Sequence, residues 1–586
     1  MKKIILTCLS IALFFAACEK DMFDPAIENN LELENAYSNA SYAQGLLLNG
    51  YARIPSNNWS FNDVATDDAV TNDRTSQFLK ISTGQWTAIN NPLDRWTGGR
   101  SAIQYLNLFL SVSDSVEWAI DPKISRLFSD RMKGEAYGLR ALHMYYLLQA
   151  HAGKSPSGEL LGIPLLLKPE TVTSDFNIPR ATFQECIEQV YKDLDSAEEL
   201  LSLDFEDIAS DAQVPSKYTG VNKDDYNRVF GFYFRGRLTS RIAKGIRTKA
   251  ALLAASPAFN AGNATAWADA ANDAAEVIDL KGGVNGLAAN GRTWYLGTEV
   301  DGLASGINPS EILWRTDIGT NNDLERTHFP PTLYGSGRLN PSQNLVNAFP
   351  MANGYPISDL ANSGYNSASP YAARDPRFQL YIMVNGSTAG TSSTVINTSA
   401  DSPTNDGLNK VETSTRTGYY MRKLLRQDVN LNPSTTSTQK HYVPRIRYTE
   451  IYLAYAEAAN EAWGPTATGG HAYSAYDVIK AIRTRAGVGT TNGDAYLESV
   501  KNNKDQMRVL IRNERRLELC FEGFRFWDLR RWNANLNETA QGVSITNGGF
   551  SIINVENRSY QSFMNYGPIP YSETLKYNNL TQNSGW

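Results

Sequence analysis

The chain has 586 residues, of which 42% are hydrophobic and 20% are charged, so it can bury a large core and is not disordered throughout. Its formal net charge of -6 disfavours nucleic acid or an anionic membrane surface as the main partner, because both require clustered positive charge. Tyrosine (30) outnumbers phenylalanine (22), and there are 11 tryptophans. Rings with a polar edge suit half-wet surfaces such as binding sites.

The N-terminus has the features of an export signal. Two lysines precede an apolar run from Ile4 to Ala17, which is too short to span a membrane and is typical of a signal peptide. The run ends in the letters FAAC at residues 15–18, which resemble a bacterial lipobox and predict that Cys18 carries lipid, palmitate included, as the mature first residue. The charged residues 19–21 look like the acidic export tags of Bacteroidetes lipoproteins. The alternative is an ordinary signal peptide followed by an incidental cysteine.

Apolar residues at helical spacing predict a series of helices along the body of the chain. Thr182, followed three residues later by Glu185, is a capping-box signature and marks the start of one of them. The predicted helices cover residues 130–151, 182–201, 238–255, 264–280, 446–463 and 473–487. Such paired helices predict a mainly α fold, an α-solenoid of the tetratricopeptide kind. The 34-residue consensus of that repeat is not clearly present in the sequence. Residues 281–440 are rich in Gly, Asn, Ser, Thr and Pro and predict long loops that cap the helices and help to line a site.

Four cysteines are present, and their positions give them different fates. Cys8 leaves with the signal peptide and Cys18 takes the lipid. Cys186 and Cys520 fall in helical patterns and are expected to be buried thiols, with a disulfide between them left open. The cysteines have no metal-finger spacing.

Residues 512–532 form a dense charged motif, RNERRLELCFEGFRFWDLRRW. Glu514, Glu518 and Glu522 are four residues apart and are expected to line one helix face, with Asp528 further along. Neighbouring carboxylates of this kind would suit a retaining glycosidase. However, a general acid needs a raised pKa, and the six surrounding arginines favour ionisation of every carboxylate nearby. The motif therefore predicts a structural ion-pair network that closes a helix against an aromatic core.

The same motif closely resembles the C-terminal signature of the SusD/RagB family of Bacteroidetes outer-membrane lipoproteins. Further segments similar to that family occur in the expected order along nearly the whole mature chain. They are Gly50-Tyr51, VATDDAV at 64–70, GEAYGLRALHMYYLLQAHAG at 134–153, GIPLLL at 162–167, RIRYTEIYLAYAEAANEA at 445–462 and the closing stretch 566–586. The departures are Trp586, where the family usually has another aromatic residue, and Cys520 within the signature.

The resemblance implies a non-enzymatic, lipid-anchored protein on the outer surface of the cell outer membrane, with no catalytic residue, cofactor or metal. Such a protein captures a glycan and hands it to a SusC-like TonB-dependent transporter in polysaccharide utilisation. The implied fold is four tetratricopeptide-like helix pairs with an irregular capping half. The expected divisions are a signal peptide (1–17), a SusD-like N-terminal region (18–225), a tetratricopeptide-like helix pair (226–290) and a RagB/SusD C-terminal region (291–586).

A sugar ring presents C–H patches, which aromatic faces cover, and hydroxyl groups, which Asp, Asn, Arg and Lys bind. Loops 56–96 and 292–338 combine both kinds of side chain and are the predicted site. The predicted glycan-binding residues are Asp67, Arg74, Trp86, Asn90, Trp294, Tyr295, Trp314 and Tyr334. Trp86 and Trp294 are expected to be exposed because their neighbours in sequence are polar turn-formers, whereas packing is the default for Trp314. Trp59 and Tyr334 are the next choices for the platform.

Two other functions stay open at this point. One is a lipoprotein of the same family that binds peptide or another nutrient, and composition does not separate it from a glycan-binding protein. The other is a glycoside hydrolase lipoprotein, which would require two carboxylates in a cleft with well-separated pKa values. Binding tests with simultaneous detection of hydrolysis products distinguish the three.

Overall fold

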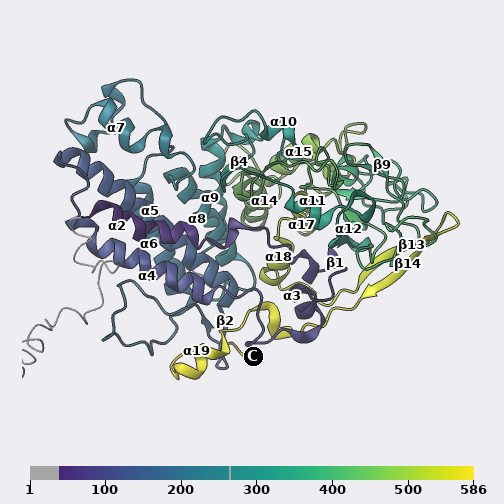
Figure 1. The fold of residues 1–586 in the computed structure, drawn as a ribbon, viewed down its shortest axis with the longest axis horizontal. Coiled ribbons are helices and arrows are strands. Elements are labelled where there is room, and N and C mark those ends of the chain that lie inside the picture. Colours follow the sequence, from purple (N-terminus) through teal and green to yellow (C-terminus); the bar gives the residue numbers. More distant parts are fainter. Residues whose placement is uncertain (1–38, 263–264) are drawn as a thin grey trace, which may run out of the picture.

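The computed structural model describes residues 39–262 and 265–586. The predicted signal peptide and Cys18 lie outside these residues. The described chain has two halves, and Figure 1 shows the helices of residues 40–280 toward the left and residues 281–447 toward the right, with the helices of residues 448–518 between and among the latter. We call them the helical half, built from long helices, and the loop-rich half, residues 281–447 together with a C-terminal hairpin.

The helical half is an array in which each helix packs on the next one along the chain. Its members are α2 (Ala40–Ala52), α4 (Trp96–Val112), α5 (Pro122–His151), α6 (Phe183–Leu200), α8 (Ser240–Ala255), α9 (Trp267–Leu280), α14 (Tyr448–Trp463), α15 (Ala475–Ala486) and α17 (Lys504–Glu518). α2 packs on α4, α4 on α5, α5 on α6, α6 on α8, α8 on α9, α9 on α14, and α14 on α15 and α17. The predicted mainly α, tetratricopeptide-like architecture is therefore confirmed, and each predicted helix is present.

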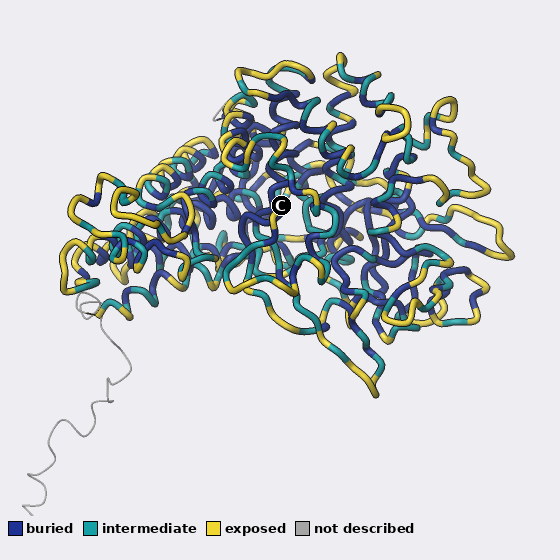
Figure 2. Tube along the Cα trace, turned by 90° about the horizontal axis from the view of Figure 1, so that it is seen from above, coloured by how far each residue is buried: buried dark blue, intermediate teal, exposed yellow. Residues whose placement is uncertain are grey.

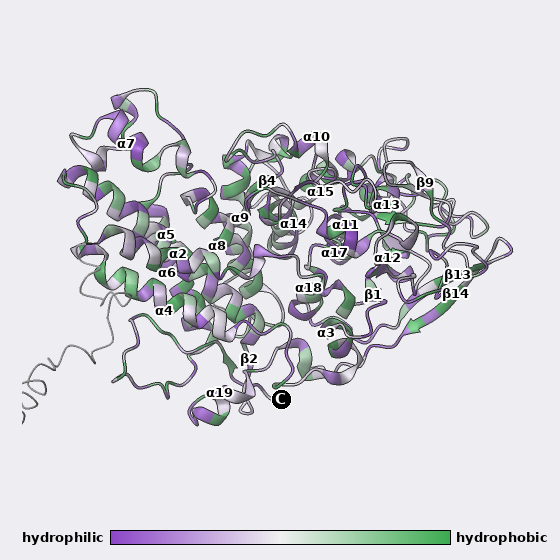
Figure 3. Cartoon of the chain, viewed as in Figure 1, coloured by the Kyte–Doolittle hydropathy of each residue, from purple (hydrophilic) through white to green (hydrophobic). Residues whose placement is uncertain are grey.

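Local sequence explains how these helices start and which face they bury. At the start of α6, the Glu185 N–H donates to Thr182 Oγ1 at 3.1 Å, and the Thr182 N–H donates to Glu185 Oε2 at 2.8 Å. The predicted capping box is thus present. Apolar and hydrophilic residues alternate within the turns of the helices (Figure 3), as amphipathic packing requires. Cys186, on α6, and Cys520 are both buried free thiols.

The loop-rich half has little regular structure, as its composition predicts. Its strands pair only two by two, in antiparallel ladders. These ladders include β1 (Ala69–Thr71) with β6 (Leu339–Pro341), β4 (Ile312–Arg315) with β12 (Pro444–Arg447), β5 (Gly319–Asn321) with β11 (Gln439–His441), and β7 (Ile382–Met383) with β10 (Tyr420–Met421). The longest is the hairpin of β13 (Ala540–Thr546) and β14 (Gly549–Glu556). Exposed chain lies mainly at the periphery, while buried chain runs through the interior of both halves (Figure 2).

The charged motif folds differently from the single helix face that its spacing predicts. α17 ends at Glu518, and a turn follows in which Phe521 has φ 64 and Gly523 has φ 78. A second helix, α18 (Arg525–Arg531), then begins. The expectation that three glutamates line one helix is therefore wrong at Glu522, because α17 ends at Glu518 and the left-handed Phe521 precedes Glu522 in the turn. None of the helices in residues 39–262 and 265–586 is long and apolar enough to cross a membrane.

Candidate functional site

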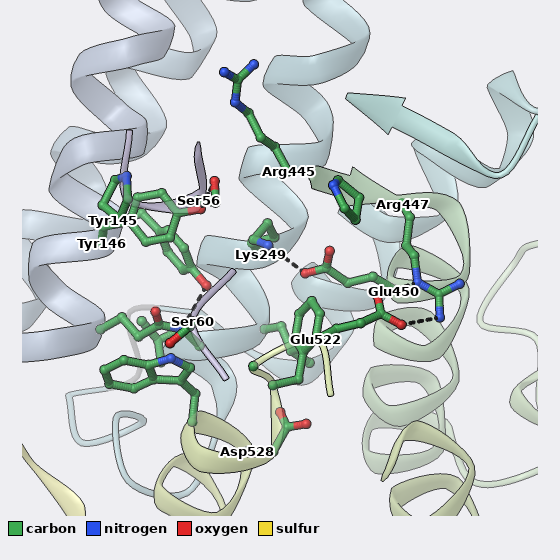
Figure 4. Close-up of a pocket in the computed structure, with 18 of the residues that line it drawn as sticks. Ser56, Ser60, Tyr145, Tyr146, Lys249, Arg445, Arg447, Glu450, Glu522 and Asp528 are labelled. Atoms are coloured by element: carbon green, nitrogen blue, oxygen red, sulfur yellow. Dashed lines mark hydrogen bonds and ion pairs between the residues drawn. The ribbon is translucent and has the colours of Figure 1, made fainter. Parts of the chain in front are cut away.

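A pocket opens where the two halves meet, and we call it the junction pocket (Figure 4). Its cavity volume is about 130 Å³. Its walls come from residues 55–60, the C-terminal end of α5, the middle of α8, strand β12, the first turn of α14, the turn after α17, and α18. Segments far apart in the sequence therefore build one concave surface.

Aromatic rings form much of this surface. The half-buried rings of Trp59, Phe524 and Trp527 line the pocket together with Tyr145 and Tyr146 at the end of α5. The Tyr146 hydroxyl donates to the Ser56 hydroxyl at 2.9 Å. Such rings offer flat apolar faces beside polar atoms.

Arg95 joins two of these rings. The centre of its guanidinium group lies 4.7 Å from the ring centroid of Tyr146 and 5.0 Å from that of Trp527. Its Nη1 donates to Gln149 Oε1 at 2.9 Å. A cation between two ring faces holds α5 and α18 in register at the pocket wall.

Charged pairs line the rest of the pocket. Lys249 Nζ donates to Glu450 Oε1 at 2.7 Å, and Figure 4 shows the two side chains meeting in the pocket. Burial by itself lowers the pKa of Lys249, but the Glu450 carboxylate outweighs it and raises that pKa above its usual range. Burial raises the pKa of the neighbouring Tyr145 to about 12, so its hydroxyl keeps its proton at neutral pH. The groups in this part of the pocket thus have fixed charges and fixed directions.

Each remaining carboxylate that lines the pocket is bound by basic side chains. Glu522 accepts from Arg447 Nε at 2.8 Å, and Asp528 accepts from Arg515 Nε at 2.7 Å and from Arg531 Nε at 2.8 Å. Burial favours the neutral form of Asp528, but the two guanidinium groups outweigh burial and lower its pKa. The arrangement therefore suits hydrogen bonding to a polar ligand and does not favour a general acid.

Trp86 and Trp294 are buried, so the expectation that they are exposed is wrong. Trp86 is 3% exposed and its ring is enclosed by Phe526, Tyr560 and Trp586, with centroid separations of 5.9, 6.3 and 4.9 Å. These rings come from the end of the chain, so polar neighbours in sequence give no warning of them. Both tryptophans belong to core clusters.

Trp294 is likewise buried, in part by rings that lie far from it in the sequence. It is 0% exposed and lies against Trp59, Tyr295 and Tyr442. Tyr295 is itself buried, and so is Trp314, whose Nε1 donates to the Gly236 carbonyl at 2.9 Å. These three predicted residues fill the core and present no open ring face.

Asp67 is bound within the protein and does not present a free carboxylate. Its Oδ2 accepts from Arg516 Nη2 at 2.9 Å and from Arg525 Nη2 at 2.8 Å. Burial opposes its ionisation, but the two arginines outweigh burial and hold the pKa of Asp67 below its usual range. The predicted structural ion network of residues 512–532 is confirmed, and Asp67 is part of it.

The other predicted residues lie at the surface or near it, away from the junction pocket. Arg74 is exposed in a polar groove that it shares with Asn72, Arg416 and Asn554, among other residues, and whose cavity volume is about 500 Å³. None of the described residues that line this groove is aromatic. Tyr334 is 56% exposed. The groove is larger than the junction pocket, but it lacks the rings on which a sugar stacks, and we therefore favour the pocket.

Asn90, the remaining predicted residue, is half-buried and belongs to the architecture of its own loop. Its Nδ2 donates to the Gln85 carbonyl at 3.2 Å, and its backbone N–H donates to Thr87 Oγ1 at 3.0 Å. These bonds fix the turn between Trp86 and the start of α4. The structure gives Asn90 no place in the pocket.

Sequence reasoning missed most of the pocket because its residues sit on helices that looked purely structural. Tyr145 and Tyr146 lie in the buried C-terminal part of α5, and Lys249 shares a face of α8 with the apolar Ile246, Leu252 and Leu253. A polar side chain on an apolar helix face was the feature of the sequence that could have indicated the pocket. Trp59, the alternative platform named from sequence, does line the pocket.

Comparison with known proteins places the chain in a family. A sequence model described as the SusD family matches residues 311–586, and another, described as "Starch-binding associating with outer membrane", matches residues 30–218. A SusD-like protein of Formosa agariphila is 35% identical over 106 residues, a match that spans 18% of this chain and 19% of that protein.

Solved structures show the same fold. A SusD-like protein of Bacteroides fragilis has a TM-score of 0.69 at 22% identity, with 96% of this chain and 100% of that chain covered. A SusD-like carbohydrate binding protein of the same species has a TM-score of 0.67 at 21% identity, covering 93% and 99%. Surface glycan-binding protein A of Bacteroides fluxus has a TM-score of 0.58 at 16% identity, covering 94% and 100%. The two family models together match well over half of the residues, and the chain therefore belongs to the SusD/RagB family, as its signature segments predict.

Proposed function

We propose that this protein binds glycan at the junction pocket and has no catalytic activity. The observation that carries the proposal is the combination, in one pocket, of the half-buried rings of Trp59, Phe524 and Trp527 with charged groups of fixed direction. Aromatic faces bind the C–H patches of a sugar ring, and charged donors and acceptors bind its hydroxyl groups. The starch-binding description of one matching family model, and the names of two structural neighbours, support this ligand class.

The proposal includes a place in the cell. Cys18 anchors the protein by lipid to the outer face of the outer membrane, where it delivers its glycan to a SusC-like TonB-dependent transporter. The name of a matching family model, which refers to association with the outer membrane, supports the location. A Cys18→Ala variant should leave the outer membrane fraction, because an otherwise water-exposed chain needs acyl chains to stay on the bilayer. Fractionation after labelling with a radioactive fatty acid measures this, and unchanged retention of the variant would refute the anchor.

Glycan binding is tested with the purified protein on an array of plant, algal and host oligosaccharides, followed by titration calorimetry with whichever oligosaccharide is retained. Trp59→Ala and Trp527→Ala should each raise Kd about 5- to 150-fold, since stacking on one ring contributes roughly 1–3 kcal/mol. Tyr233→Ala is the matched control, because that ring is 82% exposed and lies outside the pocket. Tyr334→Ala tests the alternative platform.

The outcomes separate the alternatives. Loss of binding in Tyr334→Ala with normal binding in both tryptophan variants would move the site to the surface loops. Shortened oligosaccharides after long incubation would indicate a hydrolase, and retention of peptides instead of glycans would replace the ligand class. The paired carboxylates of the pocket lead us to expect intact glycan.

A further inference from the structure

Another pocket lies at the start of α17, and we call it the α16 pocket. It forms where residues 355–362 of the loop-rich half meet α16 (Ala495–Val500) and the first turns of α17. Its cavity volume is about 320 Å³, within the range of about 300–1,000 Å³ that is usual for ligand pockets. None of the described residues that line it also lines the junction pocket.

Helix α17 separates the two pockets. Gln506 lines the α16 pocket and Arg515 lines the junction pocket, and both residues belong to α17. They are nine residues apart, which places them about 14 Å apart along the helix axis and, at about 3.6 residues per turn, on opposite faces of the helix. A ligand in one pocket therefore does not occupy the other.

Two tyrosine rings supply apolar surface in the α16 pocket. The ring centroids of Tyr355 and Tyr496 are 5.6 Å apart and their planes are inclined at 56°, so the rings form a corner. Both side chains are half-buried, and Val509 beside them is 65% exposed. Burial raises the pKa of Tyr496, so its hydroxyl keeps its proton at neutral pH and can donate.

Polar side chains that solvent reaches surround these rings. Asn362, Ser499 and Gln506 are exposed, and Asp359 is half-buried. The Asn362 amide donates to both carboxylate oxygens of Asp359, at 3.1 and 3.0 Å, and so holds the carboxylate in place. Carboxylate, amide and hydroxyl groups are the partners that sugar hydroxyl groups require.

The walls of the α16 pocket are tied together by one buried ion. Arg483, on α15, donates from Nη2 to the Gly354 carbonyl at 3.0 Å and from Nε to Asp494 Oδ2 at 2.6 Å. Gly354 directly precedes Tyr355, and Asp494 is the N-cap of α16. Since both walls are bonded to the same guanidinium group, the pocket is formed before a ligand arrives, and binding costs little ordering.

We propose that the α16 pocket is a second glycan-binding site and that it takes neutral sugars. The two rings cover the C–H patches of a sugar, and the polar side chains around them bind its hydroxyl groups. Asp359 is the one charged residue among the described residues that line the pocket, so a uronate or sulfate group would be repelled there. This inference rests on the proposed glycan binding and adds to it a separate site with its own specificity.

Titration calorimetry with the neutral oligosaccharide retained on the array tests the proposal, and the wild type should show two sites per protein chain. Tyr355→Ala should raise the Kd of one site about 5- to 150-fold and leave the other unchanged, since one stacking ring is lost. Tyr355→Phe keeps the ring and should raise that Kd less. Trp59→Ala should weaken only the other site.

A second variant blocks the pocket from its rim. Val509→Arg places a long side chain across the opening and should remove the same site as Tyr355→Ala, while the exposure of Val509 leaves folding unaffected. Ile120→Arg is the matched control, because Ile120 is 96% exposed and lines neither pocket. Sulfated and uronate-containing oligosaccharides of the same length should not bind at this site.

The outcomes distinguish this inference from the proposed function. Unchanged binding in folded Tyr355→Ala and Val509→Arg proteins would overturn the second site and leave the proposed function intact. A single site that these two variants abolish and Trp59→Ala leaves unchanged would support the α16 pocket and refute binding at the junction pocket. Preference of the α16 pocket for acidic oligosaccharides would overturn its assigned specificity, and absence of any glycan binding would refute both proposals.

Discussion

The two halves of the molecule satisfy their buried polar groups in different ways. In the helical half the backbone bonds within each helix, so side chains mainly fill space, and its core cluster is rich in alanine and leucine. In the loop-rich half many carbonyls receive no N–H from a strand or helix, and basic side chains donate to them instead. Arg374 Nη2 donates to the Val346 and Phe349 carbonyls, and Lys423 Nζ donates to the Glu518 and Cys520 carbonyls.

This difference accounts for the charge that is buried where the loop-rich half meets α17, while the helical half also buries ion pairs of its own, such as Arg140 with Asp193. A basic side chain that binds carbonyls inside the protein brings a charge with it, and that charge requires carboxylates nearby. Arg377, Glu514 and Glu518 are fully buried, and Arg377 Nη1 donates to Glu514 Oε2 and to Glu518 Oε1, at 2.9 Å in each case. Irregular backbone in the loop-rich half is thus held by ions, which also tie it to α17, whereas the helical half relies mainly on apolar packing.

The largest effect is expected from removing one of these ions. Arg377→Met leaves Asp375, Glu514 and Glu518 without their shared partner, and should lower the free energy of unfolding by about 3–5 kcal/mol. Urea unfolding followed by circular dichroism measures it. Arg126→Met is the control in the helical half, because its ion pair with Asp130 is exposed and contributes at most about 1 kcal/mol. Equal losses of unfolding free energy in the two variants would contradict the contrast between the two halves.

Asp63 gives the loop-rich half a pH dependence. Burial, and then the nearby charge of Asp68, raise the pKa of Asp63 to about 7. Because the folded state holds this proton more tightly than the unfolded state, its stabilising contribution is present below about pH 4 and is lost as pH rises to about 7.

Asp63→Asn removes this titration while its side-chain oxygen still accepts from the Phe521 N–H, as Asp63 Oδ1 does at 3.2 Å. The variant should gain up to about 4 kcal/mol over the wild type between pH 4 and pH 8, since one pKa unit corresponds to about 1.4 kcal/mol. Unfolding curves at several pH values measure the difference between the two proteins. A difference that stays constant with pH would show that Asp63 is ionised throughout.

In the helical half, stability is expected to be most sensitive to a change in the volume of a buried side chain. Leu139 is 0% exposed on α5, and Leu139→Ala should cost about 3 kcal/mol through the cavity that it leaves. Leu139→Met keeps most of the volume and should cost less than about 1.5 kcal/mol. By contrast, the similarly conservative Arg377→Lys should remain costly in the loop-rich half, because lysine does not reproduce the forked contacts of arginine. Chemical denaturation of all three variants makes the test.

The smallest expected effect concerns a local signal. Thr182→Ala removes the side chain that caps α6 and should lower stability by about 1 kcal/mol. Thermal unfolding should show a shift of about 1 °C, because the entropy of unfolding grows with chain length. A shift as large as that of Leu139→Ala would mean that the end of α6 does more than start a helix.

These contrasts also show what the sequence predicts well. Helix periodicity and capping depend on residues a few positions apart, so α5, α6, α8, α9, α14 and α15 are predictable, as is the ion network of residues 512–532. The junction pocket is not, because its walls meet across long stretches of sequence, 90 residues from Ser56 to Tyr146 and 201 residues from Lys249 to Glu450. The prediction that Trp86 is exposed is wrong for the same reason, since the rings that bury it lie at the opposite end of the sequence.

The closing contacts of the chain have a consequence for the order of folding. The Asn583 amide donates to the His151 carbonyl at 3.0 Å and accepts from Arg180 Nη1 at 2.8 Å, so the end of α5 is completed by residues more than four hundred positions later. The helices of the first half therefore lack that partner until the last residues of the chain have joined them. Contacts of such long range slow folding, and an unsealed helical edge is prone to aggregation until they form.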